Sequence, residues 1–557
     1  MVDKFFGFLY RETTTLNQAA LLLGLFAFLS HVLAFIRDRL LAHIFGASTE
    51  LDIYYAAFRV PDFIFVVAAS VVSLSVLIPF IVEKDRAGQE SVHTFINNIF
   101  SFFSILIVTV SLAAFFLMPF IASFLFGGFS DSEIERVVFI SRVMLLSPVI
   151  LGFSSLLGSI NQAYNRFATY ALAPILYNTG IVLGILFLGE RLGILGVAIG
   201  VVLGAVLHVL IQIPPVLKHN LFPRFASLNF GAVREVAKIS LPRTLTLSMS
   251  SIGLIFLVAM ASLMPEGSVS VLSFSFNIQA VLISIIGVSY SLAAFPDLSR
   301  RFRESNFDAF LNQMAVTARF LIFWALPLTA LFVIIRAQIV RVILGSGLFD
   351  WNDTRLTAAL LALFTLSSMF QCLGLLFIRG FYSAGFTRIP LIINAVSTAA
   401  MLGGTWFLIK FFYISETFNS FITTLFRVED LSGTEVLMLP LGFSLATILN
   451  GVLHWIVFEK KFKGFSAGVL GAFLKNLVAA FFVGLGAYFG LYVLSSVLDT
   501  TTLLGIFFQG LFAGLFGLAL GTIVLILLKS SELFEVWNVI KNKFWRSKVI
   551  AADSEMV

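Results

Sequence analysis

Charge, proline and cysteine are all scarce in this sequence. Only 12% of its 557 residues are charged, 14 are proline, and one, Cys372, is cysteine. One cysteine excludes a disulfide framework and a metal site made of several thiolates. Because 59% of the residues are hydrophobic, a soluble domain is excluded as well, since no globular core could hide that much apolar surface.

Long apolar runs take the place of the missing charge. A helix needs about 20 apolar residues to cross the hydrocarbon layer, whereas the strands of a membrane barrel would alternate polar and apolar residues. The sequence therefore predicts an all-α polytopic membrane protein with about fourteen transmembrane helices. The predicted spans lie near residues 16–41, 54–82, 94–126, 136–163, 169–189, 192–216, 236–263, 269–296, 312–343, 356–383, 389–413, 436–458, 467–495 and 501–528.

Basic residues fall in alternate loops between these spans. Such loops stay on the cytoplasmic side of a membrane, so the pattern predicts an even number of spans with both termini in the cytoplasm. The net charge of +6 then reflects loops facing anionic lipid, and no nucleic acid is expected as a partner. The alternating set is Lys84, Arg86, Arg166, Lys218, Arg224, Arg300, Arg301, Arg303, Arg388, Lys460, Lys461, Lys463, Lys541, Lys543, Arg546 and Lys548, with Arg136, Arg191 and Arg427 as exceptions.

The N-terminal segment, residues 1–17, carries charges of both signs and no small-residue cleavage site. We expect a retained cytoplasmic lead-in there, not a signal peptide.

Parts of the sequence repeat at a constant offset. Residues 58–61 resemble residues 276–279, and residues 163–166 resemble residues 381–383. Chance similarity among apolar helices is the alternative explanation. A parallel repeat places the substrate between two lobes that rock to give alternating access. The predicted domains are an N-lobe (1–217), a C-lobe (218–463), an appended helix pair (464–529) and a basic tail (530–557) that forms an amphipathic helix on the cytoplasmic surface.

The first predicted hairpin, Ser30 to Phe65, is charged although its surroundings are apolar. A charge near the bilayer centre costs at least about 2.5–3.5 kcal/mol, so such residues face a water-filled cavity or a partner. We therefore interpret the hairpin as the wall of a polar chamber. The alternative is that Arg37 to Arg39 reach the membrane surface and residues 46–52 form a plain loop. The charged residues of the chamber are Arg37, Asp38, Arg39, Asp52, Arg59 and Asp62.

In a two-lobe transporter, the first two helices of each lobe would face each other. This arrangement places the hairpin opposite Arg243, Asn277 and Gln279, although Arg243 also fits an ordinary position at the cytoplasmic interface. Arginine in excess over acid favours an anionic ligand, because the guanidinium fork binds phosphate through two hydrogen bonds. We expect Asp38 and Asp52 to pair with these arginines, since an unpaired buried charge is expensive.

Histidine and the familiar catalytic motifs add little to this site. His31 lies shortly before the arginine group, and histidine is the side chain whose ordinary pKa allows titration near neutral pH, whereas His208 and His454 suit interface or packing positions. The sequence has no P-loop, no zinc-ligand spacing, no G-x-S-x-G and no H-E-x-x-H. We expect a transporter driven by an ion or substrate gradient, not an enzyme, and no metal site. The predicted substrate-binding set is Ser30, His31, Arg37, Asp38, Arg39, Asp52, Arg59, Asp62, Arg243, Asn277 and Gln279.

One run of the first hairpin resembles a known signature. F-I-R-D-R-L-L-A-H-I-F-G-A-S-T-E-L-D (residues 35–52), followed by A-A-F-R-V-P (residues 56–61), is similar to the opening of the MurJ (MviN) lipid II flippases. These belong to the multidrug/oligosaccharidyl-lipid/polysaccharide exporter superfamily. Softer likenesses follow in N-Q-A-Y-N-R-F (residues 161–167), in the stretch Gly347 to Thr354 and in R-G-F-Y-S (residues 379–383).

The resemblance implies an inner-membrane flippase that carries the undecaprenyl-pyrophosphate-linked peptidoglycan precursor to the outer leaflet, for cell-wall synthesis and cell shape. It implies that cationic cavity residues hold the pyrophosphate, that an acidic residue of the first hairpin is required, and that the last two helices form a groove for the lipid tail. Drive by membrane potential or by a cation such as Na⁺ or H⁺ is implied too. We also expect membrane lipids and the cell-wall synthesis machinery as partners, and a monomer. The matching motif positions are Arg37, Asp38, Asp52 and Arg59.

The chain departs from the family at three positions. The family often has arginine where this chain has His31, Phe65 and Asn277, so the chamber is less cationic than the resemblance implies. Flippase activity on another polyprenyl-linked glycan is one alternative, and a cation-coupled drug exporter of the same superfamily is the other. The exporter would need an acidic chamber with few arginines, which this hairpin does not offer.

Overall fold

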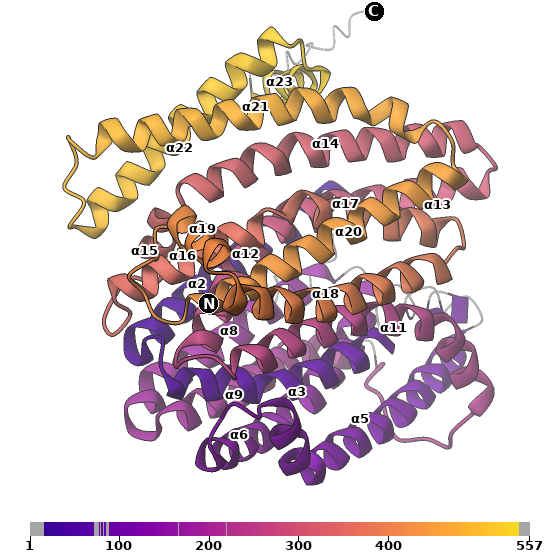
Figure 1. Ribbon diagram of the computed structural model, residues 1–557. Helices are drawn as coiled ribbons and strands as arrows, with labels where there is room; N and C mark the ends of the chain where they lie inside the picture. The colour runs from indigo at the N-terminus through magenta and orange to yellow at the C-terminus, as the bar shows by residue number, and fades with distance from the viewer. Residues whose placement is uncertain are drawn as a thin grey trace, which may run out of the picture. The chain divides into compact units, whose positions relative to one another are not determined.

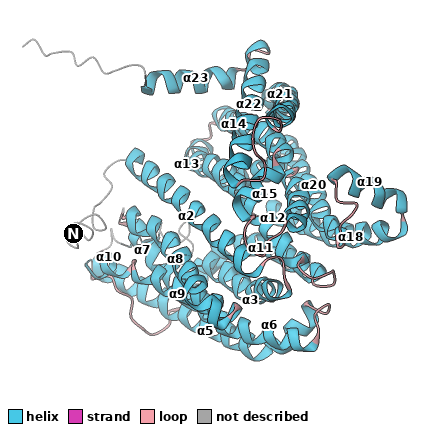
Figure 2. Cartoon of the chain, turned by 90° about the vertical axis from the view of Figure 1, so that its left-hand side faces the viewer, coloured by secondary structure: helices cyan, strands magenta, loops and turns pink. Residues whose placement is uncertain are grey.

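Helix is the only regular structure in the part of the chain that the structure describes. This computed structural model describes residues 16–71, 77, 80–81, 83–84, 88–164, 166–218 and 220–544, and no strand occurs among them (Figure 2). The predicted all-α membrane fold is therefore confirmed. Predictions for the N-terminal lead-in before residue 16, for the end of the second span, and for Arg86, Arg546 and Lys548 fall outside these residues.

The helices follow one another along the chain, joined by loops and turns. In chain order they are α2 (Leu16–Phe45), α3 (Thr49–Val71), α5 (Gln89–Leu125), α6 (Asp131–Met144), α7 (Leu146–Ala163), α8 (Phe167–Leu192), α9 (Ile194–Leu210), α10 (Ile213–Lys218), α11 (Phe230–Ala261), α12 (Ser268–Leu282), the π-helix η1 (Ile283–Val288), α13 (Ser289–Arg303), α14 (Phe307–Ile334), α15 (Arg336–Leu344), α16 (Trp351–Thr365), α17 (Ser368–Ser383), α18 (Arg388–Ile414), α19 (Glu416–Phe426), the 3₁₀ helix η2 (Thr434–Leu437), α20 (Met438–Lys461), α21 (Phe465–Leu494), α22 (Leu503–Leu527) and α23 (Ser531–Phe544).

Most of these helices are suited to a membrane. Within the described residues, twelve helical segments are long and apolar enough to cross one, and the bent pair of α16 and α17 adds a thirteenth. The predicted first span corresponds to α2, which carries Arg37, Asp38 and Arg39 and is not among those segments. The predicted polytopic architecture holds.

The chain packs as two compact units. The first comprises Met1–Val281, Val340–Phe364 and Gly385–Asn450, and the second comprises Leu282–Ile339, Thr365–Ala384 and Gly451–Val557. The lobes expected from the repeat, with their boundaries at residues 217 and 463, stay a prediction.

Glycine lets two helices of the first unit approach closely. α8 packs against α9, and α2 lies along α8 (Figure 1). A methyl group on Gly180 would lie 2.3 Å from the Cα atom of Gly204, so only glycine fits at this crossing. Small residues give such close packing in membranes, where lipid offers no hydrophobic drive between helices. This packing fixes α8, and with it Asn178, beside α2.

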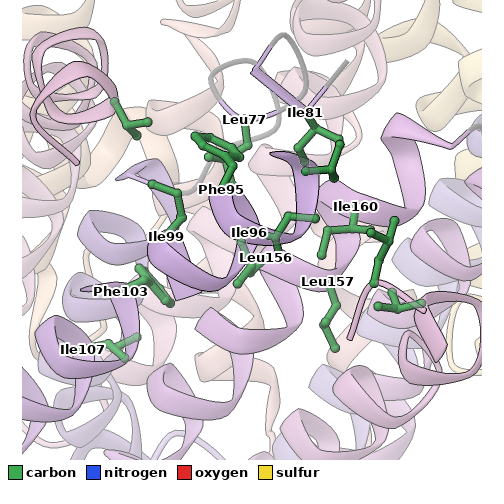
Figure 3. Close-up of a cluster of buried hydrophobic side chains, with 14 of the residues drawn as sticks. Leu77, Ile81, Phe95, Ile96, Ile99, Phe103, Ile107, Leu156, Leu157 and Ile160 are labelled. Carbon is green, nitrogen blue, oxygen red and sulfur yellow. The ribbon is translucent and has the colours of Figure 1, made fainter. Parts of the chain in front are cut away.

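An apolar cluster packs α3, through Ala68, against α5 and α7. It joins α5 and α7, through residues such as Phe103, Ile107 and Leu156, to Leu77 and Ile81 (Figure 3). Because lipid is as apolar as these side chains, the cluster stabilises the unit through tight van der Waals packing and not through removal of water.

The second unit holds the last helices. α21 and α22 pack antiparallel and α14 lies along α21 (Figure 1). α23 forms a helix over residues 531–544, where the sequence predicts an amphipathic tail helix, and its place on the cytoplasmic surface stays a prediction. Leu533 and Val536 pack toward α14 and α22, whereas Phe534 and Trp537 are exposed.

Candidate functional site

Arg37 and Asp38 form the centre of a polar network inside the first unit. The Arg37 guanidinium donates from Nε and Nη2 to Oδ1 of Asp38, at 2.9 and 2.7 Å, and from Nη1 to Oδ1 of Asn178 at 3.0 Å. Asn178 on α8 also donates to Ser30, at 3.4 Å. The other carboxylate oxygen of Asp38 accepts from Asn277 of α12 at 3.2 Å. Such charge-assisted bonds are about twice as strong as neutral ones, so Asp38 neutralises Arg37 and joins α2 to α12.

One face of α12 receives polar side chains from the hairpin. Ser270, Ser273 and Asn277 recur at the three- and four-residue spacing of a helical face, and they contact Asp52, Arg59 and Asp38 respectively. Asp52 and Ser270 lie 218 positions apart in sequence. The same separation lies between residues 58 and 276, which belong to the predicted sequence repeat, and the repeat itself stays a prediction.

Arg59 is the cation of this site that the protein leaves least satisfied. Its Nη2 donates to Ser273 at 3.2 Å, but its Nε is buried without a hydrogen-bond partner among the described residues. No described carboxylate forms an ion pair with it. A buried donor without a partner costs about 1–3 kcal/mol, and an anion bound at this position would remove that cost.

The two helix N-termini at the start of α3 and α12 cap each other. Asp52 accepts hydrogen bonds from the backbone N–H of Gly267 at 2.8 Å and of Ser270 at 2.7 Å, and from the Ser270 hydroxyl at 2.5 Å. In return, Glu266 accepts from the backbone N–H of Thr49 at 2.9 Å. Each N-terminus carries a partial positive charge, so the two carboxylates remove a repulsion that would otherwise oppose their contact. The Thr49 N–H lowers the pKa of Glu266, which lies in the loop before α12.

Arg39 contributes a third contact at this end of the hairpin. Its Nη1 donates to the carbonyl oxygens of Val342 at 2.7 Å and Ile343 at 3.5 Å, in the last turn of α15. A cation at a helix C-terminus is favourable. Close by, a methyl group on Gly347, whose φ is +60°, would lie 2.2 Å from the His43 carbonyl oxygen. We call the contacts of Asp52, Glu266, Arg39 and Gly347 the hairpin seal.

A cavity of about 310 Å³ opens beside the network, among α2, α3, α6, α7, α8 and α9. Arg37, Asp62, Tyr177 and His208 line it together with apolar residues that include Phe65. His208 is held through Nδ1, which lies 2.7 Å from the Ser154 hydroxyl oxygen. The lining of the cavity is thus mostly apolar with a few polar side chains, and its volume is large enough for a small polar group.

The structure therefore divides the predicted site residues. Ser30, Arg37, Asp38 and Asn277 form one hydrogen-bonded network with Asn178, while Arg39 and Asp52 belong to the hairpin seal. The alternative of a plain loop over residues 46–52 does not hold, because α3 begins at Thr49.

The other five predicted residues have different surroundings. Arg59 donates to Ser273 of α12. Gln279 is buried on α12, His31 is half-buried on α2, and Asp62 lines the cavity. The side chain of Arg243 lies outside the described residues.

Sequence reasoning included Asn277 of α12 in the site but missed Ser270 and Ser273 of the same helix. The three residues share one helical face, and that spacing was a readable signal. Asn178 of α8, which is not in the predicted site set, binds Arg37 of α2 directly. Tyr177 carried no signal of its own.

Comparison with known proteins decides the family. Residues 41–513 match the family model described as lipid II flippase MurJ. The chain belongs to the MurJ family. It is 24% identical to the "Probable lipid II flippase MurJ" of Buchnera aphidicola subsp. Schizaphis graminum, over 85% of this chain and 89% of that protein. It is also 24% identical to the "Lipid II flippase MurJ" of Burkholderia cenocepacia, over 67% of this chain and 75% of that protein.

Solved structures show the same fold. A structure described as "Lipid II flippase MurJ, inward closed conformation" has a TM-score of 0.69 and 21% identity, covering 91% of this chain and all of that one. An inward-facing MATE transporter of the MOP superfamily has a TM-score of 0.63 and 16% identity, covering 78% of this chain and 96% of that one. MurJ and MATE transporters therefore share this architecture, and the site residues must separate their functions.

Proposed function

We propose that this chain is a flippase that moves lipid II, the lipid-linked peptidoglycan precursor, from the inner to the outer leaflet of the bacterial inner membrane. Family membership over residues 41–513 supports the transport class. The observation that carries the anionic substrate is Arg59, whose buried Nε has no partner among the described residues. A pyrophosphate oxygen supplies the missing acceptor, and a guanidinium binds it through two parallel bonds.

The two arginines take different parts in this proposal. Arg59 contacts the pyrophosphate first because no described carboxylate forms an ion pair with it. Arg37 follows only when the anion draws it from Asp38, whose second oxygen still accepts from Asn277. The headgroup enters sideways between α2 and α12, while the isoprenoid tail stays in lipid against a groove of α21 and α22.

The hairpin seal serves as the gate of the proposed cycle. With both termini in the cytoplasm, as the basic loops predict, the starts of α3 and α12 lie on the outer side. The seal then closes the outer exit, and the lobes rock to release the precursor when the seal opens. Membrane potential or a coupled cation such as Na⁺ or H⁺ drives the return. The monomeric state and contact with the cell-wall synthesis machinery stay predictions.

Complementation tests the proposed substrate. This gene is placed in a bacterium depleted of its own lipid II flippase, as wild type, Arg37→Ala and Arg59→Ala. We expect rescue by the wild type and none by either variant at equal membrane abundance. Arg136→Ala is the matched control, because Arg136 is a half-exposed arginine that pairs with Glu50 away from the network.

A second polyprenyl-linked glycan is the competing substrate. Phe65 lines the cavity and Asn277 binds Asp38, so neither adds the positive charge that the family often has there. Failure of a correctly inserted wild type to rescue, with restored export of another polyprenyl diphosphate glycan, would favour this competing substrate. A drug exporter is disfavoured because two arginines lie where a cationic drug would need acids.

A further inference from the structure

The cavity beside the Arg37 network contains one carboxylate, that of Asp62. Within the described residues this carboxylate accepts no hydrogen bond and forms no ion pair. Arg59, one turn earlier on α3, influences it only through space. Asp62 therefore differs from Asp38 and Asp52, which are fully engaged by hydrogen-bond donors.

The groups that face Asp62 do not neutralise it. Arg37 lines the same cavity from α2, but its charge is taken by Asp38. Tyr177 faces it from α8 and His208 from α9, while the cavity residues of α6 and α7 carry no titratable group. On α3 itself, Arg59 is the charged group that acts on Asp62. α11 and α5 also pack against α3, but none of their described residues lines the cavity. An ionised carboxylate without a partner in apolar surroundings is costly, and uptake of a proton removes the cost.

The neighbouring anion site gives this proton a consequence. The four charged groups of the region, Arg37, Asp38, Arg59 and Asp62, sum to zero when all are ionised. A diphosphate that binds Arg59 adds negative charge one helical turn from Asp62 and screens the nearest cation. Both effects favour the protonated carboxyl. By reciprocity, the protonated carboxyl must favour the diphosphate to the same degree.

We propose that Asp62 is a proton-binding site whose occupancy is linked to binding of the diphosphate at Arg59. This inference rests on the proposed function and adds a coupling ion, its residue and the sign of the coupling. One proton is taken up from water as the anion binds, so affinity rises as pH falls. Asp62 does not touch the phosphate. It is a positioning residue that sets the charge around Arg59.

The test measures affinity against pH at constant ionic strength. The full chain in nanodiscs is titrated with lipid II, and separately with undecaprenyl diphosphate, from about pH 5.5 to about pH 8. For the wild type we expect Kd to rise about tenfold across this range, since a shift of one pKa unit corresponds to a factor of ten. Asp62→Asn mimics the neutral carboxyl. Its Kd should therefore be constant over the whole pH range and close to the Kd that the wild type shows at low pH.

Matched variants and a second readout make the assignment specific. His208→Gln and His31→Gln remove the nearby histidines and should keep the wild-type slope. In weakly buffered solution with an indicator dye, binding should take up a proton in the wild type but not in Asp62→Asn. Asp62→Glu, which keeps the titratable group, should restore both the slope and the uptake.

Four results would overturn the proposal. If Kd of Asp62→Asn depends on pH as in the wild type, Asp62 is not the proton-binding residue. If Kd of His208→Gln does not depend on pH, the proton binds to His208. Binding without any pH dependence rejects the linkage while leaving the proposed function intact. Absence of binding by the wild type to either lipid at every pH contradicts the proposed function, and this inference falls with it.

Discussion

Arg37 and Arg59 lie on neighbouring helices, yet the protein treats their charges differently. Arg37 has a carboxylate and an amide as partners, whereas Arg59 has one serine hydroxyl and a buried Nε without a partner among the described residues. A charged group that is paired with other groups of the protein stabilises the fold. A charged group whose donors lack acceptors in the protein is available to bind a ligand. At this scale we therefore assign the primary anion contact to Arg59.

Replacing Arg59 by glutamine tests that assignment. Charge-assisted hydrogen bonds contribute about 1.5–3 kcal/mol, so the affinity for undecaprenyl diphosphate should fall by about tenfold to a hundredfold. The melting temperature should hold or rise, because the change removes a buried donor that lacks an acceptor. Binding and thermal unfolding are measured side by side, with Arg136→Gln as the control. Unchanged affinity with a lowered melting temperature would make Arg59 a structural residue.

Part of this site was readable from the sequence and part was not. Charge in an apolar hairpin marked Arg37, Asp38 and Arg59 correctly as one polar region, because insertion of a charge is costly wherever it occurs. The individual pairings were not readable. Asn277 was predicted to lie opposite the hairpin, but its bond to Asp38, 239 positions away, depends on how far apart two helices are placed, which no local pattern encodes.

At the scale of the element, the start of a helix decides what an acidic residue in its first turn does. Asp52 was expected to pair with an arginine, a pairing that suits a chamber wall. Because α3 and α12 begin side by side, three donors of the α12 N-terminus take the Asp52 carboxylate instead. Helix boundaries are the least certain part of a sequence-based prediction, so a capping role could not be distinguished from an ion pair beforehand.

Asp52→Ala should loosen the hairpin seal. Loss of a capping side chain costs about 0.5–2 kcal/mol, and the two N-termini lose a shielding charge. We expect a cysteine at Ala47, in a Cys372→Ala background, to react about tenfold faster with a water-soluble maleimide. The control is Ser415→Ala, which removes the N-cap of α19. The Ser415 hydroxyl accepts a hydrogen bond from the Phe418 N–H at 3.3 Å. An equal rate in both variants would contradict the seal.

The pH response of the seal follows from Glu266. The Thr49 N–H lowers the pKa of this carboxyl in the closed contact, so Glu266 stabilises closure above its ordinary pKa and loses this effect as pH falls through the lowered value. Labelling at Ala47 should therefore be constant around neutral pH and rise only in acid. Glu266→Gln should abolish the acid-dependent rise. A rise near neutrality that survives in Glu266→Gln would place the responsible group elsewhere.

At the scale of the whole molecule, alternating access requires contacts that form in one state and break in another. The Ser70 hydroxyl of α3 lies 2.6 Å from the Thr244 hydroxyl of α11, and both are buried. In the predicted domain organisation these helices belong to different lobes. Apolar runs and alternating basic loops were enough to predict the helical membrane fold, because the bilayer admits few solutions. They carry no information about which state of the cycle the chain adopts.

A disulfide between these two positions should stop the cycle. In a Cys372→Ala background, Ser70→Cys with Thr244→Cys should transport when reduced and lose transport on oxidation, with recovery after reduction. The control pair is Ser397→Cys with Asn450→Cys, whose native side chains lie 3.1 Å apart within the predicted C-lobe. Oxidation should leave that pair active. Full transport by the oxidised Ser70 and Thr244 pair would show that α3 and α11 need not separate.

The most direct test of the central claim is translocation of lipid II in reconstituted vesicles. Purified protein is inserted with labelled lipid II, and the fraction reached by a membrane-impermeant modifying reagent is followed over time. We predict that wild type and Arg136→Gln move lipid II well above the protein-free rate, and that Arg59→Gln is at least about tenfold slower, in line with its loss of anion binding. Lipid II movement at the protein-free rate by the wild type, or equal rates for wild type and Arg59→Gln, would contradict the account.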